Sequence, residues 1–320
     1  MHNSKRWIRA VVFLLLIAVF GECMKFALIP PGYMRQDMHN IRENKYDDIF
    51  VGTSHGFAGI SPEEVDRVTG RKSTNLCLPN EFPIDSYYLV REACRYNKPK
   101  RVIYELDPGY WVVDVNKGKE EVFIYNEFPS SVLKLQYAAE KFGKLDFRYT
   151  LFPWLFYRQQ ISQIPENLKM KLSKQYREYD PAVTYSEVQY YKSEGFLYHN
   201  RVEESKGDLN IVLWKEEKIK KERKDYFEKM AAFCKKEGIE LIAVTLPVPQ
   251  DTLDAYPKVY QQSHEYYSQL LKEHGITYYD FNYIDEEGID RSLENYYDYD
   301  GHMYGDYAEK FSSVLGKYLK

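Results

Sequence analysis

Residues 47–56 of this chain read DDIFVGTSHG, and they predict a short buried strand that ends in a glycine-flanked turn. The apolar run in the middle is bounded by acidic residues and by glycine, as in a buried strand of a parallel sheet. Residues 61–64 (SPEE) predict that a helix follows, with Ser61 as N-cap, Pro62 in the first turn and Glu64 closing a capping box. A strand that leads directly into a helix is the repeating unit of an α/β fold.

The same alternation continues along the chain. Further strands are expected at residues 73–78, 101–106, 240–246 and 276–281, and further helices at residues 83–96, 216–237, 258–273 and 304–319. Between them, residues from about 110 to 215 are rich in Tyr, Phe and Trp but lack clear periodicity, which indicates a Tyr-rich, helical insertion. We therefore expect a three-layer, doubly wound parallel sheet, in which ligands bind beyond the carboxyl ends of the strands.

Composition excludes some classes of protein. The 320 residues are 44% hydrophobic and 29% charged, with a net charge of -4 and a pI of about 6.1. A nucleic-acid-binding protein normally carries a basic surface, so that class is not expected. The four cysteines lack metal-ligand spacing, and we expect no metal and no organic cofactor. They are interpreted as small buried apolar residues, with a bridge between Cys77 and Cys94 as an alternative.

The N-terminus has the pattern of a membrane anchor. Lys5, Arg6 and Arg9 precede or border the apolar run of residues 10–20, which ends in the bulky Phe20 without a small-residue cleavage pattern. An uncleaved signal-anchor over residues 1–29 is therefore favoured over a cleaved signal peptide. The positive-inside rule then predicts a single-pass protein of the cell membrane, with residues 30–320 as an extracytoplasmic domain.

Two polar segments follow the first and last expected strands. Ser54 lies between Gly52 and Gly56, where the backbone can turn tightly and a substrate can approach closely. Residues 298–303 (DYDGHM) place His302 just before the last helix, with acidic residues close in sequence. A histidine held by a carboxylate can act as the base for a serine hydroxyl. Because both segments follow strands, both can face one crevice.

Residues 51–62 (VGTSHGFAGISP) resemble the first conserved block of the SGNH/GDSL-like hydrolase superfamily, and residues 297–319 are similar to its last block. The resemblance, over residues 45–107 and 216–320, is closest to a membrane-anchored branch of cell-envelope modification proteins. That branch includes the D-alanine transfer protein of teichoic-acid pathways and alginate-type O-acetyltransferases. The resemblance implies a flavodoxin-like SGNH fold and a Ser-His-Asp triad.

In that triad, Ser54 is the expected nucleophile and His302 the base. Asp300 is the favoured orienting carboxylate because the acetyltransferase branch resembles Asp-x-His, and Asp298 is the alternative. The family's Gly-x-Asn-Asp oxyanion block is missing, which leaves Asn80 as the best side-chain donor.

Two more residues of these segments are substrate-site candidates. Gly52 is a candidate of the oxyanion and substrate site because glycine allows a substrate to approach closely, and the N–H of Ser54 itself is expected to help hold an oxyanion. His55 is expected to line the substrate cleft rather than to act as the base.

The resemblance implies acyl transfer or acyl-ester hydrolysis on a cell-surface polysaccharide or teichoic-acid-like polymer. It also implies a polytopic membrane acyltransferase as partner. The alternative hypothesis is a catalytically decayed SGNH-fold protein that binds or scaffolds within an envelope-modification complex. The reactivity of Ser54 discriminates between the two.

Overall fold

The fold is seen in a computed structural model that describes residues 2–114, 121–143, 148, 151–202, 206–209 and 211–320. The strands of the main sheet are β1 (Asp48–Val51), β2 (Ser73–Asn75), β3 (Arg101–Glu105), β6 (Glu240–Thr245) and β7 (Thr277–Asp280). The helices around that sheet are α3 (Ser54–Gly59), α4 (Pro62–Thr69), α5 (Pro83–Ala93), α12 (Lys221–Glu237), α13 (Gln250–Ala255), α14 (Pro257–Glu273) and α15 (Gly305–Tyr318).

The five strands form one parallel sheet in the order β2-β1-β3-β6-β7. The chain starts in the middle of the sheet, builds one edge, and then crosses back to build the other. Such an order has a switch point next to β1, where loops from the two halves diverge and leave a crevice at the carboxyl ends of the strands. The predicted α/β class and parallel sheet are confirmed, and each predicted strand falls within three residues of the observed one.

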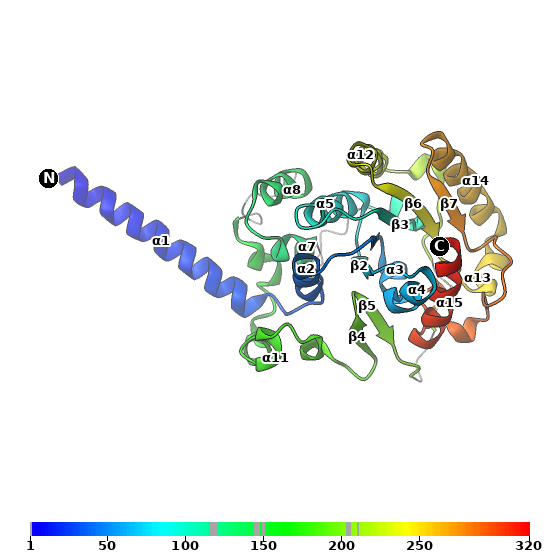
Figure 1. Ribbon diagram of the computed structural model, residues 1–320. Helices are drawn as coiled ribbons and strands as arrows, with labels where there is room; N and C mark the ends of the chain where they lie inside the picture. The colour runs from blue at the N-terminus through cyan, green and yellow to red at the C-terminus, as the bar shows by residue number, and fades with distance from the viewer. Residues whose placement is uncertain (1, 115–120, 144–147, 149–150, 203–205, 210) are drawn as a thin grey trace.

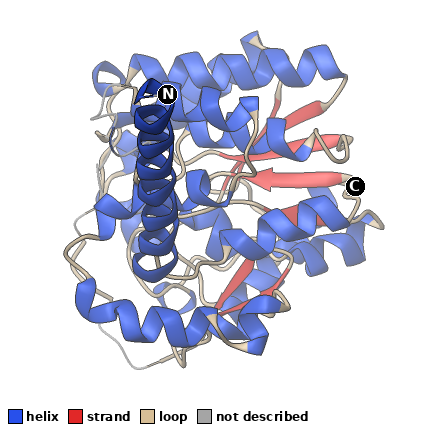
Figure 2. Cartoon of the chain, turned by 90° about the vertical axis from the view of Figure 1, so that its left-hand side faces the viewer, coloured by secondary structure: helices blue, strands red, loops and turns tan. Residues whose placement is uncertain are grey.

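Helices cover both faces of the sheet. Helix α4 packs against α15 on one face, and α5 packs against α12 on the other. Figure 1 shows these pairs on opposite sides of the strands, and Figure 2 shows the same three layers from the side of the N-terminal helix. The buried side chains of the sheet and of both helix layers form one continuous apolar core, in which Phe50, Val102 and Val244 of three adjacent strands are fully buried.

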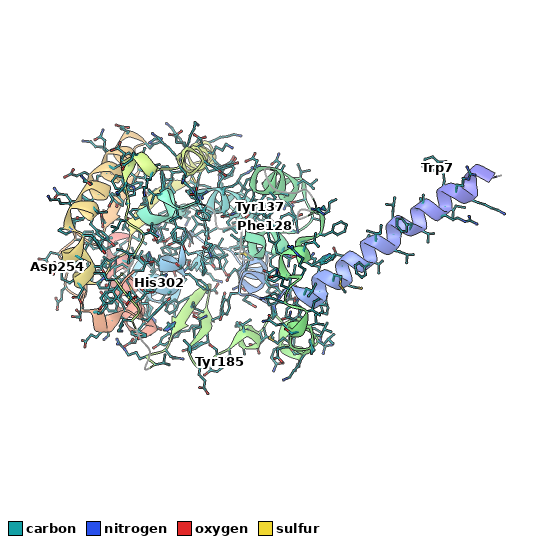
Figure 3. The ribbon with its side chains drawn as sticks, turned by 180° about the vertical axis from the view of Figure 1, so that it is seen from behind. Trp7, Phe128, Tyr137, Tyr185, Asp254 and His302 are labelled. Atoms are coloured by element: carbon teal, nitrogen blue, oxygen red, sulfur yellow. The ribbon has the colours of Figure 1, made fainter. Side chains whose placement is uncertain are left out.

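The N-terminal helix α1 (His2–Leu28) projects away from this domain (Figure 1). Residues Lys5–Leu28 contain an 18-residue stretch with a mean hydropathy of 2.3, and the helix is long and apolar enough to cross a membrane. Figure 3 shows the side chains along α1 standing clear of the domain, from Trp7 to the point where the helix joins it. The coarser prediction, an N-terminal apolar helix of membrane-spanning length, is therefore confirmed.

The segment between α1 and the sheet and the insertion after β3 contain these further elements: α2 (Met34–Glu43), α6 (Pro108–Val112), α7 (Glu121–Glu127), α8 (Val132–Phe142), α10 (Ile164–Lys171), α11 (Lys174–Arg177), β4 (Gln189–Ser193) and β5 (Phe196–His199). Short 3₁₀ helices occur at Pro153–Tyr157, Ile161–Gln163, Pro181–Thr184, Glu216–Lys218 and Leu293–Asn295. The prediction of a helical insertion holds for its described parts, but the β4–β5 hairpin was not predicted. Other parts of the predicted insertion lie outside the described residues.

The hairpin protects the edge of the main sheet. Its turn contains Glu194 and Gly195, both with positive φ, and the Glu194 carbonyl accepts a hydrogen bond from Asn75 of the edge strand β2. Edge strands expose unpaired backbone groups, and a covering segment removes that liability. The turn of this hairpin, although part of the insertion, thus pairs with a backbone group of the edge strand β2.

Two local predictions were wrong. The Ser61 side chain does not cap α4; instead the Ser61 N–H donates to Ser312 of α15, so no capping box forms. The four cysteines are all free, which excludes the Cys77–Cys94 alternative in this structure, and Cys23 on α1 is exposed rather than buried.

A buried ion pair ties β1 to β3. Arg101 Nε donates to Asp48 Oδ1 at 2.8 Å, and its terminal nitrogens bond to Asp48 Oδ2 and to the Leu319 carbonyl after α15. The Asp48 side chain is fully buried. Removing one member of such a pair leaves an unpaired charge in the core.

We therefore expect Asp48→Ala to lower the free energy of unfolding by about 3–5 kcal/mol. Thermal denaturation of the full chain in detergent measures the effect. The exposed pair of Lys221 and Asp225 provides the matched control, because surface pairs contribute about 0–1 kcal/mol. Equal melting temperatures for Asp48→Ala and Asp225→Ala would show that the buried pair does not stabilise the fold.

Candidate active site

Ser54 is the first residue of α3, and only Gly52 and Thr53 separate it from the end of β1 at Val51. Thr53 is the N-cap of this short helix, and its hydroxyl accepts a hydrogen bond from the His55 N–H at 3.3 Å. Gly52 has a φ of 153°, and a Cβ built at this position would lie 2.5 Å from the Glu105 carbonyl oxygen. Only glycine allows this close approach, so the sequence around Ser54 is fixed by packing against β3.

Two buried carboxylates hold the turn before Ser54. Glu105 Oε2 accepts hydrogen bonds from the Thr53 N–H at 2.7 Å and from the Thr53 hydroxyl at 2.8 Å. Glu81 Oε1 accepts from the Gly52 N–H at 3.1 Å and from the Ser86 hydroxyl at 2.6 Å. Burial raises the pKa of both carboxyls above their ordinary value, and these hydrogen bonds partly offset that effect.

His302 is positioned by the turn that precedes α15. Asp298 Oδ1 accepts hydrogen bonds from three backbone N–H groups of this turn, at 3.0–3.1 Å, and Gly301 allows the bend with a φ of 114°. Asp298 Oδ2 lies 2.7 Å from His302 Nδ1. Tyr297 stacks on the imidazole at 5.3 Å between ring centroids, which limits its rotation.

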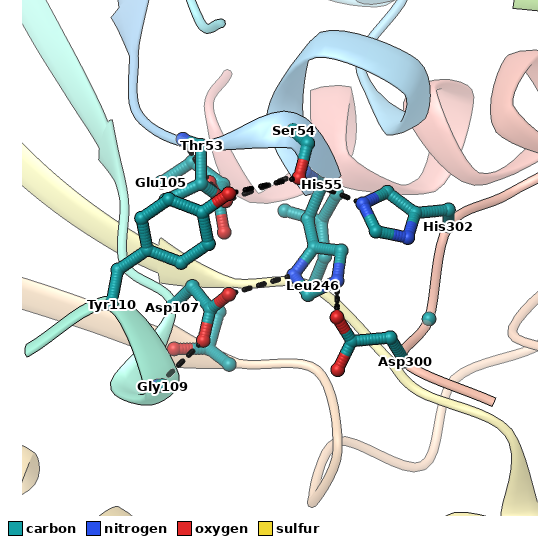
Figure 4. Close-up of polar contacts among 12 residues, drawn as sticks. Thr53, Ser54, His55, Glu105, Asp107, Gly109, Tyr110, Leu246, Asp300 and His302 are labelled. Carbon is teal, nitrogen blue, oxygen red and sulfur yellow. Dashed lines mark hydrogen bonds and ion pairs between the residues drawn. The ribbon is translucent and has the colours of Figure 1, made fainter. Parts of the chain in front are cut away.

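The structure brings Ser54 and His302 together across 248 residues of sequence. Ser54 Oγ lies 2.7 Å from His302 Nε2 (Figure 4). With Nδ1 donating to Asp298, Nε2 is the acceptor for the serine proton, which is the hydrogen-bond order of a Ser-His-Asp triad. The His302 side chain is only 14% exposed, so little water competes for these bonds.

The carboxylate at Nδ1 is Asp298, not the favoured Asp300. The side chain of Asp298 folds back into its own turn and so reaches His302, whereas Asp300 points toward His55 (Figure 4). Burial alone would raise the pKa of Asp298, but the hydrogen bond and charge of His302 outweigh it and hold that pKa below its ordinary value.

His55 forms a second histidine–carboxylate group beside the triad. Its Nδ1 lies 3.3 Å from Asp107 Oδ2, and its Nε2 lies 3.9 Å from Asp300 Oδ2, too far for a hydrogen bond. Burial would lower the pKa of His55, but the carboxylates, Asp107 foremost, raise it to about 9. His55 is therefore a buried cation near neutral pH, with its ring 4.5 Å from that of His302.

Three groups are candidates for binding an oxyanion at Ser54: its own N–H, the side-chain amide of Asn80 and the hydroxyl of Tyr110. No described residue accepts a hydrogen bond from the Ser54 N–H, which is at the N-terminus of α3, and none bonds to the side-chain amide of Asn80. Tyr110 Oη lies 3.4 Å from Ser54 Oγ and accepts from the Asn80 N–H at 3.3 Å. The Gly52 N–H donates to Glu81 Oε1 and is therefore not available to an oxyanion.

Sequence reasoning missed Glu105, Asp107 and Tyr110. All three come at or just after the end of β3, where the sheet rule places ligand-binding residues, and that position was the available signal. Residues 105–109 (ELDPG) lack the Gly-x-Asn-Asp pattern expected of an oxyanion block, so their contribution was overlooked.

Next to the triad is a pocket of about 320 Å³, here called the polar pocket. Its lining includes the aromatic residues Tyr110, Trp214 and Tyr260, and polar groups from His55 and Asp300. His55 Nε2 is buried in the wall of this pocket, and no residue in the described part of the chain forms a hydrogen bond with it. Aromatic faces combined with unpaired polar groups suit a polyhydroxyl ligand.

His55, Asp300 and His302 also bring three metal-ligand atoms within 4.8 Å of one another. Both nitrogens of His302 already have partners in Ser54 and Asp298, however. An ion at this position would have to break the contact between His302 and Ser54, so the group does not fit a resident metal that coexists with the triad.

Comparison with known proteins finds no matching protein-family model and no matching curated protein. The functional interpretation therefore depends on the geometry of the site itself.

The charge of His55 can be measured directly. We expect its imidazole to titrate with a pKa of about 9, and Asp107→Asn to move that pKa toward the ordinary value of 6.5, because Asp107 makes the largest contribution that raises it. Histidine-selective NMR titration of the full chain measures both, with His55→Gln for assignment and Asp180→Asn, on the exposed surface of the insertion, as control.

The same charge predicts a pH-dependent stability. Because the folded-state pKa is raised, the contribution of His55 is complete below pH 6.5 and is lost as the pH rises through about 9. The difference in melting temperature between wild type and His55→Gln should shrink over this window. A His55 resonance that titrates near 6.5 in the wild type would contradict this account.

Proposed function

We propose that this protein is a serine-dependent acyltransferase or esterase, whose nucleophile is Ser54. The observation that carries the proposal is the linear chain Ser54 Oγ–His302 Nε2 and His302 Nδ1–Asp298 Oδ2, with 2.7 Å at each step. A nucleophile within hydrogen-bond reach of a base, which a third group orients, is the arrangement that activates a serine hydroxyl.

In the proposed reaction, Ser54 Oγ attacks an ester carbonyl while its proton moves to His302 Nε2. Asp298 keeps the imidazole in the required tautomer and stabilises the imidazolium that forms. The tetrahedral intermediate collapses when the leaving alcohol takes the proton from His302, which leaves an ester on Ser54. An acceptor hydroxyl, or water, then gives its proton to His302 and releases the acyl group in the reverse order.

The Ser54 N–H, the Asn80 amide and the Tyr110 hydroxyl are the donors proposed for the oxyanion. The Ser54 N–H gains from the partial positive charge at the start of α3. Tyr110 contacts Ser54 Oγ in the resting site. Burial raises the pKa of Tyr110 to about 12, so its hydroxyl stays protonated and able to donate. One such donor contributes on the order of 10²–10³ in rate.

The polar pocket is the proposed site of the acyl acceptor. Its aromatic faces and the buried, unpaired His55 Nε2 favour a sugar or another polyhydroxyl compound over an apolar alcohol. Together with the apolar helix α1, this supports a cell-surface glycopolymer as substrate and a position outside the membrane for the domain. The basic residues at the start of α1 favour a cytoplasmic N-terminus.

The resemblance of residues 51–62 and 297–319 to SGNH-type envelope-modification proteins supports the same reading. The doubly wound strand order is compatible with an SGNH-type fold. A polytopic membrane acyltransferase that delivers acyl groups from the cytoplasm remains the proposed partner.

The first test is turnover of p-nitrophenyl acetate by the purified full chain in detergent. We expect Ser54→Ala and His302→Ala each to lower kcat/KM at least about 10³-fold, because the residues of a triad act as one unit. Ser268→Ala, on α14 away from the site, is the matched control and should leave turnover unchanged. If wild type, Ser54→Ala and His302→Ala are equally inert, the decayed, scaffolding alternative gains over the enzyme.

The choice of carboxylate has its own test. Asp298→Asn should lower kcat about 10³–10⁴-fold, since an amide at His302 Nδ1 favours the wrong tautomer. Asp300→Asn should have a much smaller effect, because Asp300 does not contact His302 Nδ1. The same p-nitrophenyl acetate assay compares the two variants, and a larger loss for Asp300→Asn would reverse the assignment.

A further inference from the structure

Ser54 also lines a second cavity, which is separate from the polar pocket and has a more apolar lining. This membrane-side cavity has a volume of about 310 Å³. Its apolar walls include Met34, Phe57, Leu78 and Leu197, all buried. Besides Ser54, its polar groups belong to Asn126, Glu127, Gln189 and the hydroxyl-bearing Tyr33 and Tyr297, and Asn126 Oδ1 is buried without a hydrogen-bond partner among the described residues.

The cavity lies next to the C-terminal end of α1, the helix proposed to span the membrane. Residues 29–34, which directly follow the end of α1 at Leu28, form part of its wall. The last carbonyls of α1 are held by the domain: Asn167 Nδ2 donates to Ala27 and Leu28, and Lys171 Nζ donates to Phe26. These bonds satisfy the end of the helix and fix the cavity next to the point where the chain leaves the bilayer.

Ser54 and His55 are neighbours on the first turn of α3, yet they line different spaces. Ser54 lies in the wall of the apolar cavity, and His55 lies in the wall of the polar pocket with Asp107 and Asp300. The buried apolar side chains of the wall offer no partner to a charged or strongly polar acyl group, which would lose its hydration against them. A hydrocarbon chain would gain by leaving water there.

We propose that the membrane-side cavity binds the hydrocarbon chain of the acyl group that Ser54 accepts. The inference rests on the proposed function and narrows its substrate: an ester of a fatty acid with several carbons, presented at the membrane surface, rather than an acetyl ester. The carbonyl lies at Ser54, the chain extends between Leu78 and Leu197 toward the end of α1, and the acceptor enters from the polar pocket. The cavity has room for several methylene groups, each of which takes up about the volume of a water molecule.

The test compares p-nitrophenyl hexanoate with p-nitrophenyl acetate on the full chain in phosphatidylcholine nanodiscs. The burst of p-nitrophenolate measures acylation of Ser54 and does not require an acceptor. Four extra buried methylenes, at roughly fourfold each, give an expected preference for hexanoate on the order of 10²-fold in acylation rate. Dividing each variant's rate by the wild-type rate for the same ester removes the effect of ester partitioning into the lipid.

Leu197→Trp should fill the cavity and lower the hexanoate-to-acetate ratio at least about tenfold. Leu197→Ala should shift the preference toward octanoate, and it serves as the second variant if the tryptophan protein does not fold. Leu135→Trp, the same substitution at an exposed position of α8, is the matched control and should leave the ratio unchanged.

A wild-type burst that is equal for acetate and hexanoate would overturn the inference while leaving the serine mechanism intact. So would Leu197 variants that keep the wild-type ratio. The absence of any burst that depends on Ser54, with either ester, would instead contradict the proposed function and the inference together.

Discussion

Glu105 joins the carboxyl ends of two adjacent strands, and the geometry of the active site depends on that contact. Its carboxylate, at the end of β3, accepts two hydrogen bonds from Thr53, at the end of β1. A buried carboxylate is costly unless its oxygens are bonded, and hydrogen bonds to charged groups contribute about 1.5–3 kcal/mol each. The contact also requires glycine at position 52, because the backbone of β3 leaves no space for a side chain. Ser54 is thus held by the sheet rather than by a free loop.

The residues that directly follow Glu105 at the end of β3 contribute further side chains to the site. Asp107 and Tyr110 lie two and five residues beyond Glu105, and they contact His55 and Ser54 on the first turn of α3. The histidine that completes the triad arrives from the other half of the sheet, on the turn before α15. The crevice at the switch point of the sheet therefore gathers residues from three distant segments, as the strand order dictates.

The sequence was sufficient for the sheet because buried parallel strands have an unambiguous apolar pattern. It also identified Ser54 and His302 as candidates, since both follow strands. It favoured Asp300 over Asp298 as the partner of His302 Nδ1, which was wrong, because both are near His302 in sequence and only the conformation of the turn decides which one faces the imidazole. The β4–β5 hairpin was missed because β4 is largely half-buried, β5 is mostly buried, and neither strand alternates strictly between buried and exposed residues. Contacts such as Glu105 with Thr53, 52 residues apart, leave no local signal at all.

Ser54 has a defined position relative to the end of the apolar helix α1. Asn167 and Lys171 of α10 donate hydrogen bonds to the last carbonyls of α1, so the end of this helix is fixed to the domain. Burial lowers the pKa of Lys171 to about 8, yet its contact with a helix C-terminus remains favourable whenever it is charged. The next residues, 29–34, form part of the wall of the same cavity that Ser54 lines. Under the proposed function, Ser54 would lie at a fixed short distance from the bilayer. The membrane-side cavity, which Ser54 lines, and the polar pocket, which His55 lines, would then bind the acyl group and the acceptor separately.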